Sequence, residues 1–486
     1  TVVAAVVVLL RAARLGNVRW RLAAGMTAVS FVLFAALALN DLPIAAYSFD
    51  TTESWGGFLA GQLLRAIGGA GVQSLLIFIV VAAGEPLYRA RFPEKMRIQA
   101  IFSPAGWRSK RFAVGLILGY CLAVLFIAYQ VGFYLVGRRF GAWNPADVPF
   151  DNLLNTTFPW LAVLFIGFYP AVSEEFMSRV FSIPLVEKLT RSKLLAVLVP
   201  AVIWGFAHAN YPAQPFYIRG VEVAVAGILV GLVFYRFGVL PCLVWHYVVD
   251  AGYTSMLMVR SGNAYLMLTA IAGTGVLLVP LAAALIAAWR AGGFVESSAL
   301  DNASDPPPPE PEAVAAARHG AITAPRAAWV LPFGISVAVA AAFAARWAPD
   351  PGKGVGVRLR PAEVREAART FLERRGVDTK EWRLVVTATG SVLDRNVRRY
   401  LMEQGGVAEV ARFAREVPPW RVRAFRPEER EEWQLAVDDA TAAQPLVSER
   451  RTKRLGFGQA GCDERSEARD ERSRAIPNAR ACAAPR

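Results

Sequence analysis

The sequence predicts an all-α polytopic membrane protein of about eight to nine transmembrane helices, followed by a small soluble α+β domain. Hydrophobic residues make up 55% of the 486 residues. Soluble proteins reach only about 45–50% apolar residues, even when glycine is counted. Several apolar runs in the first two thirds of the chain approach or exceed the roughly 20 residues that cross a bilayer as a helix. The mean hydropathy of +0.36 agrees with a membrane location.

Each apolar run in the core predicts one spanning helix, and polar loops separate the runs. The first run, 2–10, follows a threonine rather than a methionine, so we interpret it as part of a truncated helix. The later runs cover 22–39, 58–83, 112–136, 160–172, 194–209, 221–234, 239–259 and 265–289. Together they predict a multi-span membrane core over residues 1–292.

Lysine and arginine gather in alternate loops, which predicts the orientation of the core. Basic residues cluster at 11–21, 85–111 and 188–193, so we expect these segments on the cytoplasmic side. The loops 41–57 and 137–157 are then outside. The net charge of +14 is therefore interpreted as orientation information, and we expect no nucleic-acid partner. We expect a multi-pass protein of a bacterial cytoplasmic membrane.

The composition changes after the core. Residues 293–326 contain a run of prolines and predict a disordered linker. Residues 327–346 predict an additional transmembrane helix, which by alternation places the following segment, 350–445, on the extracytoplasmic side. The charged tail 446–486 predicts disorder.

Residues 350–445 predict the small soluble α+β domain. A helical stripe of apolar residues follows Pro361, and the segments 382–389, 420–425 and 433–437 have strand-like alternation or composition. No recognisable active site lies in this domain, so the sequence does not indicate its role.

Two adjacent glutamates, Glu174 and Glu175, end the apolar run 160–172. Ionisable groups are costly at membrane depth, so they are functional candidates by default. Arg179 lies four residues after Glu175, on the same helical face and in the order that favours an ion pair. We assign Glu175 to this pair and leave Glu174 to handle a proton. The alternative is a juxtamembrane turn whose charges are solvated.

Three more ionisable residues lie in the apolar segments that follow. His208 stands in one of them, while His246 and Asp250 are four residues apart in another and share a helical face. A single histidine in an apolar helix is more often a hydrogen-bonded core residue than a ligand. However, the spans are otherwise almost free of ionisable groups, with Arg65 and Glu222 as exceptions. We therefore expect the set to converge on one wet cavity.

Such a set supports hydrolysis by either of two routes. In the first, a metal ion held by His208, His246 and a carboxylate lowers the pKa of a bound water molecule. In the second, Glu174 and His208 activate water without a metal, while His246 and Asp250 polarise the carbonyl group and stabilise the oxyanion. Neither route needs a serine or cysteine nucleophile, and the sequence contains no His-Glu-x-x-His motif.

The three motifs, Glu-Glu-x-x-x-Arg, aromatic-x-x-x-His and His-x-x-x-Asp, match in order over about residues 110–290. This segment resembles the CPBP family of intramembrane proteases, which includes the CAAX prenyl endopeptidases and the Abi proteins of bacteriocin maturation and immunity. The resemblance implies that Glu174 is the water-activating base. It further implies that the site is supported or completed by Glu175, Arg179, His208, His246 and Asp250.

The resemblance also leaves open whether the site binds a metal ion. If a divalent metal is bound, with Zn²⁺ as the first expectation, the predicted ligands are Glu174, His208, His246 and Asp250, and the enzyme is a metalloendopeptidase. The chain departs from the family pattern at two positions. Trp204 stands where phenylalanine is usual, which we expect to change packing rather than chemistry. Asp250 stands where asparagine is frequent, which adds a negative charge and mildly favours metal binding.

These observations predict an intramembrane endopeptidase that cleaves a membrane-anchored substrate, of the CAAX-type prenylated or leader type, near the cytoplasmic face. One alternative is a scaffold or immunity-type protein of the same fold that cleaves nothing, although every motif residue is intact. Another is a proton-coupled transporter that uses the Glu, His and Asp set as a relay. A transporter predicts inverted repeats, and no such symmetry is visible in this sequence.

Overall fold

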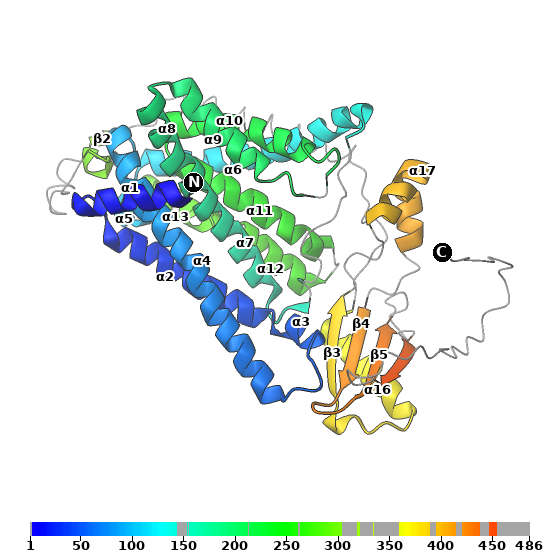
Figure 1. The fold of residues 1–486 in the computed structure, drawn as a ribbon. Coiled ribbons are helices and arrows are strands. Elements are labelled where there is room, and N and C mark those ends of the chain that lie inside the picture. Colours follow the sequence, from blue (N-terminus) through cyan, green and yellow to red (C-terminus); the bar gives the residue numbers. More distant parts are fainter. Residues whose placement is uncertain are drawn as a thin grey trace, which may run out of the picture.

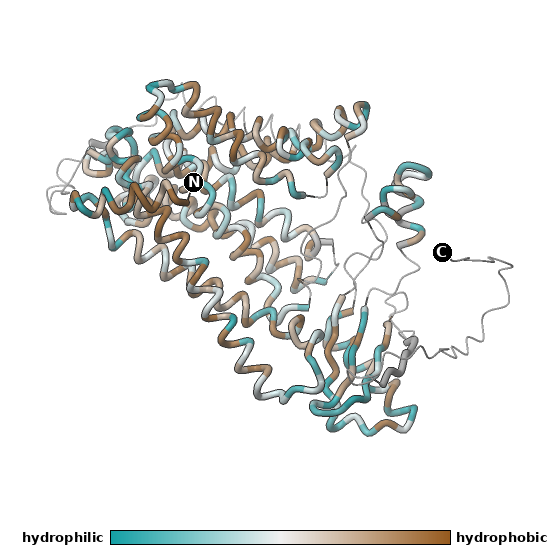
Figure 2. Tube along the Cα trace, viewed as in Figure 1, coloured by the Kyte–Doolittle hydropathy of each residue, from teal (hydrophilic) through white to brown (hydrophobic). Residues whose placement is uncertain are grey.

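The computed structural model describes residues 2–142, 153, 155–211, 213–260, 263–303, 318–320, 334, 359–388, 395–414, 420–437 and 447–453. The described part is mostly helical, with a small sheet region beside one end of an elongated helical bundle (Figure 1). Hydrophobic residues dominate along most of the bundle helices, whereas the sheet region alternates between polar and apolar residues (Figure 2).

The bundle consists of helices that follow one another along the chain. They are α1 (Val2–Arg14), α2 (Trp20–Asn40), α3 (Leu42–Tyr47), α4 (Trp55–Arg91), α5 (Pro104–Trp107), α6 (Lys110–Gly137), α7 (Pro159–Glu175), the π-helical η4 (Phe176–Phe181), α8 (Ser182–Thr190), α9 (Lys193–Phe206), α10 (Ile218–Phe237), α11 (Leu240–Arg260), α12 (Ala264–Thr274) and α13 (Leu278–Arg290). The largest buried hydrophobic cluster joins α4, α6, η4, α9, α10 and α11.

Fewer stretches are long and apolar enough to cross a membrane than we predicted. Within the described residues there are five, namely Trp20–Tyr47, Trp55–Arg91, Lys110–Phe140, Pro159–Thr190 and Ile218–Phe237. The count is six if α12 and α13, which are bent by 56°, form one span. The predicted count of eight to nine is therefore not confirmed. Helix α9, which we predicted as a span, has 14 residues, and at 1.5 Å per residue it is about 21 Å long, short of a hydrocarbon core of about 30 Å.

Two glycines let the helices that carry the site approach closely. A Cβ atom on Gly167 of α7 would lie 2.6 Å from Cε2 of Tyr247 on α11. A Cβ atom on Gly205 of α9 would lie 2.5 Å from the backbone nitrogen of Ala224 on α10. Distances this short are not tolerated, so only glycine permits the observed packing of α7 on α11 and of α9 on α10.

A π-helical turn, η4, follows the two glutamates directly. It interrupts the run from α7 into α8, and the hydroxyl group of Ser182 donates to the carbonyl oxygen of Met177, five residues earlier, at 2.6 Å. The wide turn packs on α4, where a Cβ atom on Gly84 would lie 3.2 Å from Cγ1 of Val180. Turns of this kind are rare and are frequent at functional sites.

The sheet region comprises four antiparallel strands in the order β3-β4-β5-β6. They are β3 (Arg383–Ala388), β4 (Trp420–Phe425), β5 (Glu431–Val437) and β6 (Val447–Lys453). Helix α16 (Pro361–Arg374) buries Val364, Ala368 and Leu372 against the sheet. A second helix, α17 (Arg395–Ala414), is broken at Gly406, where φ is +67°. Strand β6 lies in the segment that we predicted as a disordered tail, and a separate soluble domain over 350–445 stays a prediction.

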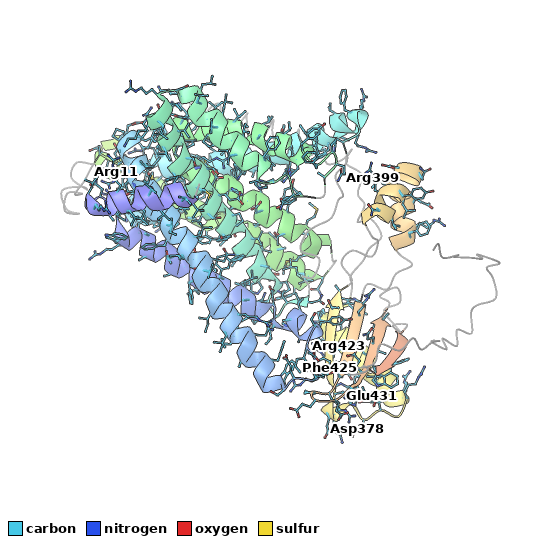
Figure 3. All side chains as sticks on the ribbon, viewed as in Figure 1. Arg11, Asp378, Arg399, Arg423, Phe425 and Glu431 are labelled. Atoms are coloured by element: carbon cyan, nitrogen blue, oxygen red, sulfur yellow. The ribbon has the colours of Figure 1, made fainter. Side chains whose placement is uncertain are left out.

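The sheet contacts the loop between α3 and α4. Nη1 of Arg423 donates to the backbone oxygens of Tyr47 and Phe49 at 2.9 and 2.7 Å. The same guanidinium group pairs with Glu432 at 2.6 Å, and both side chains are buried. The rings of Phe49 and Phe425 lie 5.3 Å apart. Figure 3 labels Arg423 and Phe425 on the part of the sheet that lies toward the bundle.

The first residues of the predicted linker pack against the core, which differs from the disorder that we expected over 293–326. Strand β1 (Phe294–Glu296) pairs with β2 (Arg318–Gly320). Asp301 forms an ion pair with Arg111, and the amide group of Asn302 donates to the backbone oxygen of Phe92 at 2.8 Å. These polar contacts hold residues 294–303 against the core, and the composition of the segment does not reveal them. Apart from Gly334, the additional helix predicted over 327–346 lies outside the described residues, as does the tail beyond 453.

Candidate active site

The structure brings all six predicted site residues into one connected cluster. Glu174 and Glu175 come from the end of α7, and Arg179 comes from η4. His208 follows the last turn of α9, while His246 and Asp250 lie on α11. The turn η4 and the close contacts of α7 with α11 and of α9 with α10 therefore position the whole set.

The buried half of the site is an ion pair that also holds a histidine. Nη1 of Arg179 donates to Oε1 of Glu175 at 2.9 Å, and the two side chains are 2% and 0% exposed. Nδ1 of His246 lies 2.7 Å from the same carboxylate oxygen. A carboxylate accepts hydrogen bonds only, so Nδ1 of His246 carries the proton and Nε2 faces the other carboxylates.

The open half of the site contains Glu174 and His208. Their side chains are 33% and 17% exposed, and Oε2 of Glu174 lies 3.7 Å from Nε2 of His208. Nδ1 of His208 donates to the backbone oxygen of Trp204 at 2.9 Å. In a neutral ring Nε2 is then an acceptor that faces the acceptor Oε2. A water molecule can donate to both atoms across this distance.

His246 and Asp250 complete the same cluster. Nε2 of His246 lies 3.7 Å from Oε2 of Glu174 and 3.5 Å from Oδ2 of Asp250. Two carboxylates and two imidazoles thus surround one small volume that is partly open through Glu174 and Asp250, whose side chains are 33% and 27% exposed. A proton can move between water and a carboxylate at this place, and a polarised carbonyl group can be held beside it.

The separations within the cluster are a few tenths of an ångström wider than those between the ligands of a zinc centre. Oε2 of Glu174 lies 3.7 Å from Nε2 of His208 and from Nε2 of His246, and Oδ2 of Asp250 lies 3.5 Å from Nε2 of His246. Ligand atoms at 2.0–2.1 Å from a tetrahedral Zn²⁺ are about 3.3 Å apart. Among the residues that the structure describes, no group of three or more His, Cys, Asp or Glu side chains could hold a metal ion.

Trp204 takes part in the site in a way that we did not predict. Its Nε1 donates to Oε2 of Glu174 at 2.6 Å, and the guanidinium carbon of Arg179 lies 4.2 Å from the centre of its ring. We expected the exchange of phenylalanine for tryptophan at this position to change only packing. The available signal was the indole N–H itself, a donor that a phenyl ring lacks.

The two exceptions among the predicted spans lie outside this cluster. Glu222 is fully buried, and both of its carboxylate oxygens accept from Nη1 of Arg219 at 2.7 Å. Gln130 also donates to Glu222 at 2.7 Å, so Glu222 belongs to a satisfied polar network between α6 and α10. Arg65 is exposed on α4.

Comparison with known proteins identifies the segment that carries the site. Residues 156–252 match the family model described as Type II CAAX prenyl endopeptidase Rce1-like, and this range contains all six residues of the cluster. No curated protein and no solved structure matches the chain. Several helices are long and apolar enough to cross a membrane, so the match lies in a multi-pass membrane protein. The resemblance predicted from the three motifs is confirmed, because residues 156–252 match the model of the Rce1-like type II CAAX prenyl endopeptidases, a family of proteases.

Proposed function

We propose that this protein is an intramembrane endopeptidase that hydrolyses a peptide bond of a membrane-anchored substrate near the cytoplasmic face. The substrate is of the CAAX-type prenylated or leader type. The observation that carries the proposal is the contrast between two adjacent carboxylates. Glu175 is fully buried and bound by Arg179 and His246, whereas Glu174 is partly exposed and faces two imidazole nitrogens.

In this proposal Glu174 is the general base. A water molecule donates to Oε2 of Glu174 and Nε2 of His208, which lie 3.7 Å apart. Glu174 takes one proton from the water, and the water oxygen bonds to the carbonyl carbon of the substrate. When the C–N bond breaks, the proton passes from Glu174 to the departing amine, so that Glu174 returns to its ionised form.

His246 and Asp250 are proposed to hold the carbonyl group and stabilise the oxyanion. His246 in its protonated form donates from Nε2, on the side where Asp250 lies 3.5 Å away. Asp250 donates to an oxyanion only as a neutral acid, because an ionised carboxylate has no proton to give. Glu175 and Arg179 fix the orientation of the His246 ring, since Glu175 accepts from both.

A decisive experiment compares purified wild type with Glu174→Gln on a panel of membrane-tethered peptides that includes a prenylated one. Mass spectrometry locates the cut. We expect wild type to cleave one class of peptide and Glu174→Gln to lose at least about 100-fold in rate, since a general base contributes about 10²–10⁴-fold. The matched control is Glu94→Gln, because the Glu94 side chain is 63% exposed in a loop outside the site.

The same assay, run with and without a chelator, tests a metal-assisted route through a divalent ion such as Zn²⁺. Activity that survives the chelator supports water activation by Glu174 and His208 alone. Absence of cleavage across the panel by folded wild type would overturn the proposal and favour a scaffold or immunity-type protein of the same fold.

We also propose that the sheet region lies on the extracytoplasmic side. Arg423 of the sheet contacts the backbone of Tyr47 and Phe49 in the loop 41–57, so both segments belong on the same side of the membrane. Two separate predictions agree with this. The low content of lysine and arginine places the loop 41–57 outside, and alternation of the spans places 350–445 outside. Arg430, exposed between β4 and β5, offers a test. After removal of the native cysteines, Arg430→Cys in intact cells is expected to react with an impermeant maleimide.

A further inference from the structure

Trp204 contacts both halves of the site at once. Its indole Nε1 donates to Oε2 of Glu174 at 2.6 Å, and the face of its ring lies 4.2 Å from the guanidinium carbon of Arg179, which pairs with Glu175. The tryptophan is 8% exposed. The side chain therefore lies between the exposed carboxylate and the buried ion pair.

The surrounding helices leave space for the full width of the indole. Gly227 of α10 lies against the six-membered ring, and a Cβ atom on this glycine would be 3.1 Å from Cε3 of Trp204. The rings of His208 and His246 lie 5.1 and 6.0 Å from the Trp204 ring, both near edge-on. The orientation of the indole is thus determined on several sides, which directs its N–H at Glu174.

A hydrogen bond to a carboxylate oxygen has two effects. It stabilises the charged form of the acid, and charge-assisted bonds of this length are stronger than neutral ones. It also fixes the direction of that oxygen. Oε2 is the atom that faces Nε2 of both His208 and His246 at 3.7 Å. The indole therefore acts on the oxygen to which the proposed water donates.

We propose that Trp204 is a positioning residue that holds Oε2 of Glu174 in the direction of the reacting water. The proposal rests on the role of Glu174 proposed above. Phenylalanine at this position keeps an aromatic face for Arg179 but has no donor for Glu174. The side chain of Trp204 thus contacts both the proposed base, Glu174, and the ion pair that orients His246.

Three variants separate the donor from the ring. Trp204→Phe keeps an aromatic ring and removes the N–H. Replacement of Trp204 by 3-benzothienylalanine keeps the bicyclic shape and exchanges the N–H for sulfur, so it removes the donor with little change in packing. Trp245→Phe is the matched control, because Trp245 is a buried neighbour whose ring lies 6.2 Å from that of Trp204.

The readout is the pH profile of kcat/KM together with kcat and KM. Both Trp204 variants are expected to lower kcat roughly tenfold with KM within about twofold, because a misdirected base slows the chemical step. The acid limb of the profile is expected to move to higher pH, since a lost hydrogen bond to a carboxylate disfavours its charged form. Trp245→Phe is expected to leave the acid limb where it is in wild type.

An acid limb unchanged in both Trp204 variants, or moved equally by Trp245→Phe, would overturn the proposal, because the effect would then belong to packing.

A second measurement does not depend on cleavage. Dicyclohexylcarbodiimide modifies protonated carboxyl groups, and mass spectrometry follows its addition to Glu174 as a function of pH. More labelling at a given pH is expected in the benzothienylalanine variant than in wild type, because the carboxylate has lost a donor.

The two experiments distinguish the two proposals. If wild type cleaves no peptide but the labelling midpoint shifts, the proposed protease function fails and the effect of Trp204 on Glu174 stands. If wild type cleaves and Glu174→Gln does not, while neither the acid limb nor the labelling midpoint responds to loss of the indole donor, the protease function stands and the role of Trp204 fails.

Discussion

Replacing Arg179 with methionine is expected to lower the free energy of unfolding by about 3 kcal/mol, because it leaves a buried carboxylate without its cation. The Arg179 and Glu175 side chains are 2% and 0% exposed, and the pair is 2.9 Å long. Loss of one partner from such a pair costs about 3–5 kcal/mol. Glu175 still accepts from Nδ1 of His246 at 2.7 Å, so we expect the lower end of this range.

The double variant Glu175→Gln/Arg179→Met provides the internal test. It removes both charges, and the glutamine oxygen can still accept from His246. We expect it to recover most of the lost stability, because neutral replacement of a buried pair is often close to neutral in free energy. Hydrolysis is not expected to recover fully, since the charge that orients His246 is gone.

The assay is denaturant unfolding in detergent micelles, read from the midpoint and slope of the transition. Arg65→Met is the matched control. Arg65 is exposed on α4, so its replacement is expected to change stability by no more than about 0.5 kcal/mol. A loss below about 1 kcal/mol for Arg179→Met, the range of surface pairs, would refute the reasoning. A double variant less stable than the single one would do the same.

Three further outcomes are expected. Gly205→Ala is expected to cost about 1–3 kcal/mol in the same unfolding assay, because the new methyl group would lie 2.5 Å from the backbone of Ala224. The control Gly25→Ala has open space around the new methyl group and is expected to leave the free energy of unfolding unchanged. Arg423→Met is expected to detach the sheet from the loop at Tyr47 and Phe49, measured as faster proteolysis of the sheet region with cleavage of peptides by the core unchanged. Asp250→Asn is expected to keep at least about a tenth of kcat/KM, because the amide supplies a donor for the oxyanion, whereas Asp250→Leu is expected to lose activity.

Each of these outcomes has a result that contradicts it. Equal stability of Gly205→Ala and Gly25→Ala would contradict the close packing of α9 on α10. Unchanged proteolysis of Arg423→Met would contradict the docking of the sheet through Arg423. Loss of activity in Asp250→Asn that equals the loss in Asp250→Leu would mean that the carboxylate itself is required.

The sequence was sufficient to predict that the candidate site residues lie together. Glu174, His208 and His246 could be expected to meet because charged and polar side chains in apolar spans must face one another or water. The i,i+4 spacing of Glu175 and Arg179 also predicted the ion pair that is observed. These inferences work because they depend on local spacing and on the cost of charge in lipid, both of which can be read directly from a chain.

The remaining features depend on packing between distant segments. The indole of Trp204 reaches Glu174 across 30 positions in sequence, and the packing of α9 against α10 and of its neighbouring rings decides where its N–H points. The pairing of Asp301 with Arg111 spans 190 positions, so a composition rich in proline and small polar residues concealed it. The length of α9 was overestimated because its apolar run continues past the helix end into a turn at His208.

The docking of the sheet through Arg423 has a consequence for the synthesis of the chain. Tyr47 and its partner Arg423 are separated by 376 positions. At roughly 5–20 residues per second, the loop after α3 waits on the order of 20–75 s before the segment that covers it is made. During this interval the side chain of Phe49, which is 1% exposed in the finished fold, lacks its neighbour Phe425. A chain that terminates before Phe425 never acquires this cover, and the aromatic side chain of Phe49 then stays without that neighbour.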